Sequence, residues 1–249
     1  MKKIAMSLIG CMLFAASSAW CEEAIDFYKL GLESSSFNQK IYYFTKAVEL
    51  NPRLAIAFKK RGMIYYFQEK YSKMLLDFRR YTALTPSDPE GFGMIGLAQL
   101  KRDNFTEAIT QLSRAIDMDP VFASAYLHRS EAYYHEKLFE QAVEDSTKAI
   151  SFGKAQSIIG KAYTVRSKAY RQLGQGDLAD KDFNKAYLLD PANYSYRYFT
   201  ITNYLASLAS DSNYIPFKDI RWLGLVGVIV LLLVLIFRLA LPTPRKNGL

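Results

Sequence analysis

The chain has 249 residues, of which 50% are hydrophobic and 22% charged, and its formal net charge is +8. So much apolar side chain, including 18 tyrosines and 16 phenylalanines, excludes a disordered chain, because disorder requires little surface to bury. The lysines and arginines are scattered through helical patterns and form no runs, which argues against nucleic-acid binding. The two cysteines provide neither a disulfide framework nor the ligand spacing of a zinc site.

The start of the chain has the form of a secretory signal peptide. Two lysines follow the first methionine, residues 4–16 are apolar, and Ser17 and Ala19 are small residues suited to a cleavage site. We therefore expect residues 1–19 to be a signal peptide. An uncleaved N-terminal anchor is the alternative.

A repeat of 34 residues organises the middle of the chain. Pro52, Pro86 and Pro120 lie at this spacing, and a second column of aromatic residues keeps it too: Phe37, Tyr71, Phe105 and Phe139. Within each repeat, apolar residues recur at helical spacing on two segments that a short polar turn separates. We predict helix-turn-helix units at residues 22–52, 55–86, 89–120, 123–154 and 160–191.

This pattern resembles the tetratricopeptide repeat (TPR) family. The third unit carries the family's motif residues as Phe92, Gly96, Phe105, Ala108, Ala115 and Pro120. The fourth unit has Lys154 where the family has proline, and the first helix of the first unit matches poorly at Ala24 and Phe27. The resemblance implies an all-α fold, a right-handed superhelix (α-solenoid) of about five repeats spanning residues 22–191.

Three units share an arginine and an aspartate that are sixteen residues apart. The pairs are Arg61 and Asp77, Arg129 and Asp145, and Arg166 and Asp182. The first and third units lack both residues. Because the two positions lie at similar height in an antiparallel helix pair, we predict a structural ion pair that bridges the two helices of each unit.

The resemblance also implies that the first helices of the units line a concave face. We expect a peptide-binding groove formed by Lys59, Met63, Tyr66, Phe67, Met94, Leu97, Lys101, Leu127, His128, Glu131, Tyr134, Lys161, Lys168 and Arg171. The same helical positions place Leu100, His135, Thr164 and Val165 on this face. Its first half is apolar and its last unit basic, which suits a protein or peptide partner with an acidic segment. The alternative is that these residues only pack units together or face water.

One type of groove is disfavoured. Some TPR proteins grip the C-terminal carboxylate of chaperones with a set of lysine, arginine and asparagine side chains across three units. Lys59 fits that set, but Met63, Met94, Ser124 and His128 do not. The sequence therefore argues against a chaperone adaptor of this type.

The end of the chain is predicted to cross a membrane. Residues 193–210 follow a helical stripe typical of a capping helix, and residues 211–221 form a linker. Trp222–Leu241 is almost wholly apolar, and twenty helical residues span about 30 Å, the thickness of a bilayer core. We expect a transmembrane helix at residues 222–241 and a cytoplasmic tail at residues 242–249; a buried soluble helix is the alternative.

No motif of a catalytic site, a cofactor site or a metal site is present, so we expect no enzyme, no cofactor and no metal. The favoured interpretation is an exported, membrane-tethered scaffold for protein–protein interaction, with the array extracytoplasmic, and periplasmic in an envelope assembly if the protein is bacterial. The alternative is a tail-anchored cytosolic TPR adaptor or receptor on an organelle membrane. A third class, a membrane-bound hydrolase, lacks its catalytic residues.

Overall fold

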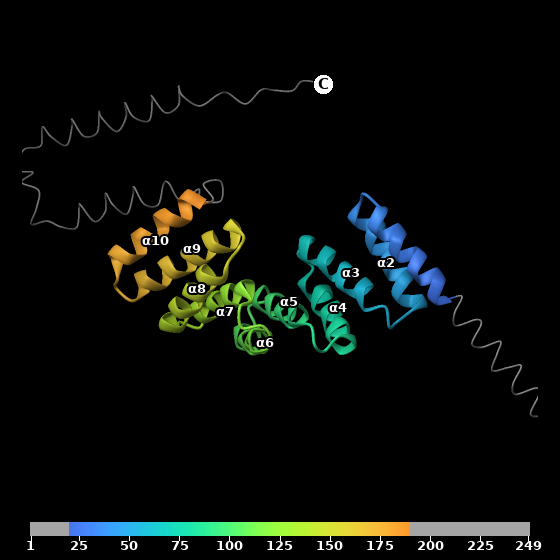
Figure 1. The fold of residues 1–249 in the computed structure, drawn as a ribbon, viewed down its shortest axis with the longest axis horizontal. Helices are drawn as coiled ribbons and strands as arrows, with labels where there is room; N and C mark the ends of the chain where they lie inside the picture. Colours follow the sequence, from blue (N-terminus) through green and yellow to red (C-terminus); the bar gives the residue numbers. More distant parts are fainter. Residues whose placement is uncertain (1–19, 190–249) are drawn as a thin grey trace, which may run out of the picture. The chain divides into compact units, whose positions relative to one another are not determined.

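The computed structural model describes residues 20–189, and every regular element in this part is an α-helix. A helix at residues 20–33 precedes α2 (Phe37–Leu50), α3 (Ala55–Phe67), α4 (Tyr71–Leu84), α5 (Pro89–Leu100), α6 (Phe105–Met118), α7 (Ala123–His135), α8 (Phe139–Phe152), α9 (Gln156–Gln172) and α10 (Gly176–Leu189) (Figure 1). The prediction of an all-α fold is confirmed for this part of the chain. The predicted signal peptide, capping helix, linker, transmembrane helix and tail lie outside the described residues. Within residues 20–189, no helix has both the length and the hydropathy that a membrane span requires.

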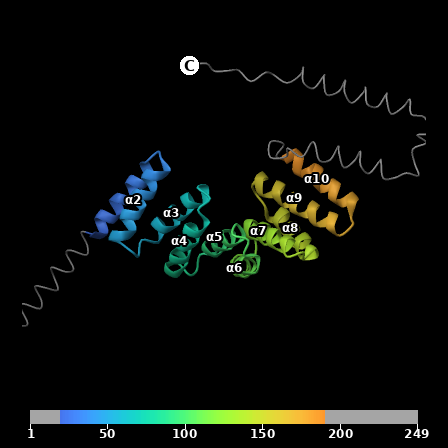
Figure 2. The same cartoon turned by 180° about the vertical axis from the view of Figure 1, so that it is seen from behind.

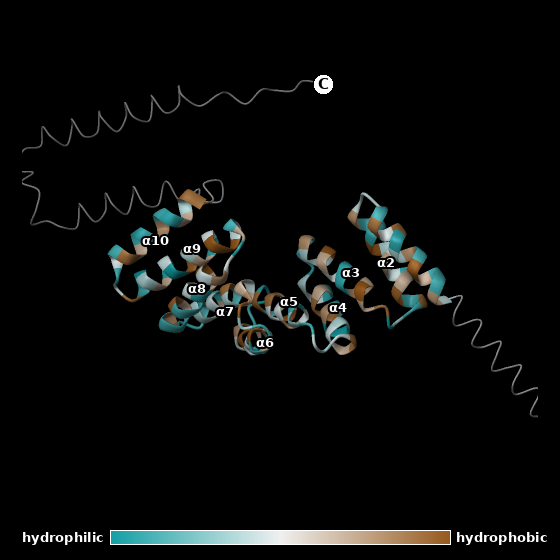
Figure 3. Ribbon diagram, viewed as in Figure 1, coloured by the Kyte–Doolittle hydropathy of each residue, from teal (hydrophilic) through white to brown (hydrophobic). Residues whose placement is uncertain are grey.

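The helices form successive hairpins that stack on one another. Helix α3 packs on α4, α5 on α6, α7 on α8 and α9 on α10 (Figures 1 and 2). The first helices of the last three hairpins also pack together, because α7 contacts both α5 and α9. Hydrophobic and hydrophilic residues alternate along the helices, as hairpins with one buried face require (Figure 3). One continuous core therefore runs between hairpins, and the first helices of successive hairpins form a shared surface.

In four of the five hairpins, the turn between the two helices uses a residue in the left-handed conformation. Glu69, Asp103, Lys137 and Gly174 have φ values of 56°, 59°, 62° and 74°. After each of them, a backbone N–H donates to the carbonyl five residues back, as Leu138 does to Tyr133 at 2.9 Å. This is the hydrogen bond of a Schellman-type helix end, and it closes the first helix in the same way in four hairpins.

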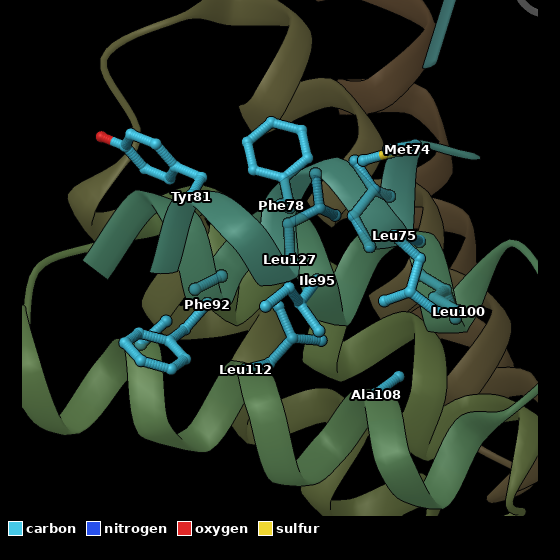
Figure 4. Packing of buried hydrophobic residues seen from close by; sticks show 14 of the residues in the cluster. Met74, Leu75, Phe78, Tyr81, Phe92, Ile95, Leu100, Ala108, Leu112 and Leu127 are labelled. Atoms are coloured by element: carbon cyan, nitrogen blue, oxygen red, sulfur yellow. The ribbon is translucent and has the colours of Figure 1, made fainter. Parts of the chain in front are cut away.

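Large core side chains pack against small residues on the facing helix. Phe78 and Leu112 are fully buried, and a Cβ at Gly62 or Gly96 would lie 2.8 Å from the Phe78 ring or 2.5 Å from Leu112 Cγ. Figure 4 shows these two side chains among their neighbours from α4, α5 and α6. The absent side chains of the two glycines are thus what lets the helices of each hairpin approach closely.

The first hairpin packs equally closely, although its large and small residues occupy each other's repeat positions. Tyr28 takes the repeat position of Gly62, and Gly31 takes that of Tyr65. The Phe44 ring then lies over Gly31, where a Cβ would be 2.5 Å away, and 5.7 Å from the Tyr28 ring. The first helix matches the motif poorly because a large and a small residue have changed places, and the hairpin is still closely packed. Ala24 in this helix is fully buried.

An insertion before the fifth hairpin lengthens its first helix. The repeat step is 37 residues there in place of 34, and α9 has 17 residues where α7 has 13. The extra residues extend α9 at its beginning, after the connection at Gly153, which ends α8 without a proline. The register of the repeat is restored from Gly160 onward.

The close approach at Gly96 predicts a specific cost for an added methyl group. Gly96→Ala should destabilise the chain by about 1–3 kcal/mol, because the new Cβ meets Leu112 and the Ala108 carbonyl oxygen. Gly160→Ala is the matched control: among the described residues the nearest atom to its Cβ would be Leu189 Cβ at 3.6 Å, so better helix propensity should make the change neutral or stabilising by up to about 1 kcal/mol. Urea unfolding followed by circular dichroism measures both, and equal effects would contradict the packing.

Candidate functional site

The structure brings the three predicted arginine–aspartate pairs together across their hairpins. Arg129 donates from Nε to Asp145 Oδ2 at 2.6 Å and from Nη2 to Oδ1 at 2.9 Å. Arg61 holds Asp77 at 2.9 and 2.7 Å, and Arg166 holds Asp182 at 2.6 and 2.9 Å, each with the same two nitrogens. Each guanidinium therefore forms a planar, two-point contact with its carboxylate.

Each arginine also makes a third bond, to the preceding hairpin. The Nη1 atoms of Arg61, Arg129 and Arg166 donate to the hydroxyls of Thr45, Ser113 and Thr147 at 3.0, 2.9 and 2.9 Å. Sequence analysis missed this bond. Its signal is a hydroxyl residue sixteen positions before the arginine in two units, and nineteen in the unit that follows the insertion.

These groups are largely removed from water. The side chains of Asp77, Asp145 and Asp182 are 2–5% exposed and those of their arginines 14–15%. Burial alone would lower the pKa of Arg129, but its hydrogen bonds to Asp145 and the attraction of that carboxylate raise it above its ordinary value. The guanidinium therefore stays charged, and losing either partner would leave a buried, uncompensated charge.

The two hairpins without this pair use apolar contacts at the same place. Phe27 stacks on Tyr43 in the first, with ring centroids 6.3 Å apart. In the third, Ile95 is buried and Gln111 donates instead to Glu107 of its own helix.

Several predicted groove residues are already engaged inside the array. Leu97 and Leu127 belong to the buried core. The Lys59 ammonium lies 3.6 Å from Asp88 and also binds Glu90, so it links the second hairpin to the third. Arg171 pairs with Asp180 at 2.8 Å. Leu97, Leu127 and Lys59 thus contact other parts of the array, whereas Arg171 and Asp180 form an exposed pair within one hairpin.

Other predicted residues form the aromatic and apolar half of the face. Phe67 is 61% exposed and stacks flat on Phe37, with ring centroids 6.1 Å apart. Met63, Tyr66 and Met94 are half-buried and pack against the core.

A pocket of about 380 Å³ opens between α5, α7 and α9. It gathers five predicted groove residues from three hairpins: Lys101, Glu131, Tyr134, Lys161 and Lys168. Leu100, His135, Thr164 and Val165 complete the wall, together with Asp103, which sequence analysis missed because it lies in the turn after α5. The ring of His135 is held in place by stacking on Phe105, with centroids 4.7 Å apart.

The charges of this pocket are unevenly matched. Among the described residues, no carboxylate lies within 4.0 Å of the ammonium groups of Lys101, Lys161 or Lys168. Burial would raise the pKa of Glu131, but His128, whose Nδ1 lies 3.5 Å from Glu131 Oε2, lowers it below its ordinary value together with Lys101 and Lys161. The three lysines thus outnumber the two carboxylates that line the pocket, Glu131 and Asp103. Within residues 20–189 no cluster of histidine, cysteine, aspartate and glutamate could hold a metal ion.

The buried pairs predict that replacing a buried, paired arginine lowers stability far more than replacing an exposed, paired lysine. Arg129→Met leaves Asp145 buried without a partner and should destabilise the chain by about 3–5 kcal/mol. Lys148→Met is the control: it removes an exposed pair with Glu144 and should change stability by less than about 1 kcal/mol. Urea unfolding of both variants measures the difference, and a loss of under about 1 kcal/mol for Arg129→Met would contradict the role of the pair.

Comparison with known proteins identifies the repeat. Two sequence models of the tetratricopeptide repeat match residues 94–153 and 160–193. The heat shock protein sti1 homolog of Schizosaccharomyces pombe is 29% identical over 85 residues, 34% of this chain and 14% of that protein. The human RNA polymerase II-associated protein 3 is 30% identical over 125 residues, 49% of this chain and 18% of that protein. The alignment with the Arabidopsis thaliana E3 ubiquitin-protein ligase CHIP, 24% identical, covers 43% of this chain and 38% of that protein. The chain thus spans well under half the length of these relatives.

Solved structures share the arrangement of helices. A crystal structure of the MamA protein matches with a TM-score of 0.60 at 23% identity, over 71% of this chain and 96% of that chain. A thermophilic TPR protein of Thermus thermophilus matches with a TM-score of 0.55 at 17% identity, over 76% of this chain and all of that chain. At these identities the likeness shows the fold. Residues 94–153 and 160–193 carry tetratricopeptide repeats, and the described part of the chain is an all-helical solenoid with the fold of these structures.

Proposed function

We propose that this protein is a non-enzymatic scaffold for protein–protein interaction, which holds an acidic segment of its partner in the pocket between α5, α7 and α9. The observation that carries the proposal is the convergence of Lys101, just after α5, and of Lys161 and Lys168, on α9, on one pocket where no carboxylate of the described residues lies within 4.0 Å of their ammonium groups. The solenoid supports it as well, since stacked repeats present extended surfaces to partners. Both family models that match describe this repeat and no enzyme.

The position of the lysines decides which part of the face would take the anion. Lys161 and Lys168 are seven residues apart on α9, so their side chains leave the same side of that helix. Lys59 is bound by two carboxylates of the array, and Arg171 pairs with Asp180 at the surface. The lysines of the predicted groove that have no carboxylate of the described residues within 4.0 Å thus gather at the α5–α7–α9 pocket, and we infer that the partner's carboxylate binds there.

The rest of the pocket restricts the partner further. Glu131 repels a second carboxylate from its side of the pocket, while Leu100, Tyr134 and Val165 provide apolar surface. A volume of about 380 Å³ is at the small end of the range typical of ligand sites, enough for a short side-chain cluster. We therefore infer a segment with an acidic residue next to an apolar one.

A pair of charge-neutralising substitutions tests the proposal. The probe is a fluorescein-labelled peptide of alternating glutamate and leucine, with a glutamine–leucine peptide as its uncharged counterpart. Lys161→Gln with Lys168→Gln should weaken binding of the glutamate peptide by about tenfold or more in fluorescence anisotropy, because each desolvated charge pair contributes on the order of 1 kcal/mol. Lys154→Gln with Lys181→Gln removes two exposed lysines elsewhere and should leave binding unchanged. Equal affinity of the wild-type protein for both peptides would refute the proposal.

Export and tethering belong to the same proposal and rest on the sequence, because residues 1–19 and 222–241 lie outside the described part. We propose that a cleaved signal delivers the array across a membrane and that Trp222–Leu241 anchors it there. A tail-anchored cytosolic adaptor is the competing assignment.

The mature N-terminus distinguishes the two. Edman sequencing of the purified chain should begin at Trp20 if the signal is cleaved after Ala19. A chain that retains Met1 and its lysines would contradict export by a cleaved signal and favour the tail-anchored adaptor.

A further inference from the structure

Two helix faces outside the pocket carry opposite net charge. The first, here called the α4 face, consists of Lys73, Leu76, Arg79 and Arg80. The second, here called the 20–33 face, consists of Glu22, Ile25, Asp26, Leu32 and Glu33 of the helix at residues 20–33. All nine side chains are exposed.

The α4 face combines three cations with an apolar centre. Leu76 is 61% exposed, and helical spacing places Lys73, Arg79 and Arg80 around it. The one carboxylate of α4, Asp77, is buried and bound to Arg61, so it does not neutralise this face. Among the described residues, none of the three cations has a carboxylate within 4.0 Å.

The 20–33 face has the complementary composition. Glu22, Asp26 and Glu33 lie on one stripe of the helix, and helical spacing places Lys29 in the same stripe, where it pairs with Asp26 at 3.1 Å in an exposed pair that contributes little. Ile25 and Leu32 are 40% and 45% exposed and lie seven residues apart, along one edge of the acidic stripe. Three carboxylates, one lysine and two apolar side chains thus oppose three cations and a leucine, so the two faces keep opposite net charge.

The two faces do not meet within one chain, since each remains exposed on its own hairpin. We propose that copies of this protein associate by placing the 20–33 face of one copy on the α4 face of another. Every copy carries both faces. In a two-fold symmetric pair, the α4 face of each copy would contact the 20–33 face of the other, so that all four faces are covered. An anionic membrane surface would account for the α4 face but leaves the acidic face unmatched, so a second copy is the occupant that the charges favour.

A charge-swap experiment tests this association directly. Two differently tagged full-length copies are co-expressed and purified in a non-ionic detergent, and the amount of the second tag recovered with the first is measured. One variant carries Lys73→Glu, Arg79→Glu and Arg80→Glu; the other carries Glu22→Lys, Asp26→Lys and Glu33→Lys. Each variant paired with itself should lose about tenfold or more of the co-purification that wild-type copies show, because like charges then face each other. Mixing the two variants should restore it, since both contacts regain opposite charge.

A matched triple variant controls for total charge. Lys137→Glu, Lys154→Glu and Lys181→Glu make the same change on other hairpins and should leave co-purification at the wild-type level. Circular dichroism and thermal unfolding establish that each variant is folded. The proposal is overturned if wild-type copies do not co-purify, if a swapped variant still pairs with itself, or if the mixture is not restored. In the first of these cases, cosedimentation of the protein with phosphatidylserine vesicles would assign the α4 face to a membrane instead.

Discussion

In three of the hairpins, one arginine joins its own helix to two others through its guanidinium group. Its Nε and Nη2 atoms hold an aspartate on the second helix of its own hairpin, and its Nη1 atom holds a hydroxyl on the hairpin before. The aspartates are almost fully buried, so the geometry is set where water cannot compete. Each of these arginines therefore fixes the packing of the two helices within its hairpin and also the position of that hairpin against the preceding one. The surface formed by the first helices, and the pocket on it, depends on both relations.

The third hairpin, in the middle of the array, is held to its neighbours by apolar packing in place of the arginine–aspartate pair. The third hairpin has no arginine at this position, and nearly every residue of α5 from Gly91 to Leu100 is buried. Three glycines of this helix lie against neighbours on three sides: Gly91 against Thr82, Gly93 against Phe122 and Gly96 against Leu112. Close apolar packing therefore replaces the ion pair where the chain is most enclosed. The pocket begins at the end of this rigid helix, which fixes Lys101 and Asp103 relative to α7.

Much of this fold could be predicted from the sequence because its period is strict. The 34-residue columns indicate which residues face the core, and the sixteen-residue spacing of arginine and aspartate identifies partners within one hairpin. What the sequence could not show depends on the neighbouring hairpin. The third bond of Arg129 and the engagement of Lys59 by Asp88 and Glu90 both require the register between units. The sequence also did not reveal that Tyr28 and Gly31 compensate for each other. Motif matching compares one position at a time, whereas here a large residue at one position is offset by a small residue at another.

The coupling between Arg129 and Ser113 is the most direct measure of whether one arginine joins neighbouring units. A double-mutant cycle with Arg129→Met, Ser113→Ala and the double variant, followed by urea unfolding of the full-length chain, isolates the contribution of this single contact. The bond between hairpins predicts a coupling free energy of about 0.5–3 kcal/mol. Additive effects of the two substitutions, within the error of the measurement, would show that the bond between Arg129 and Ser113 does not hold the two hairpins together.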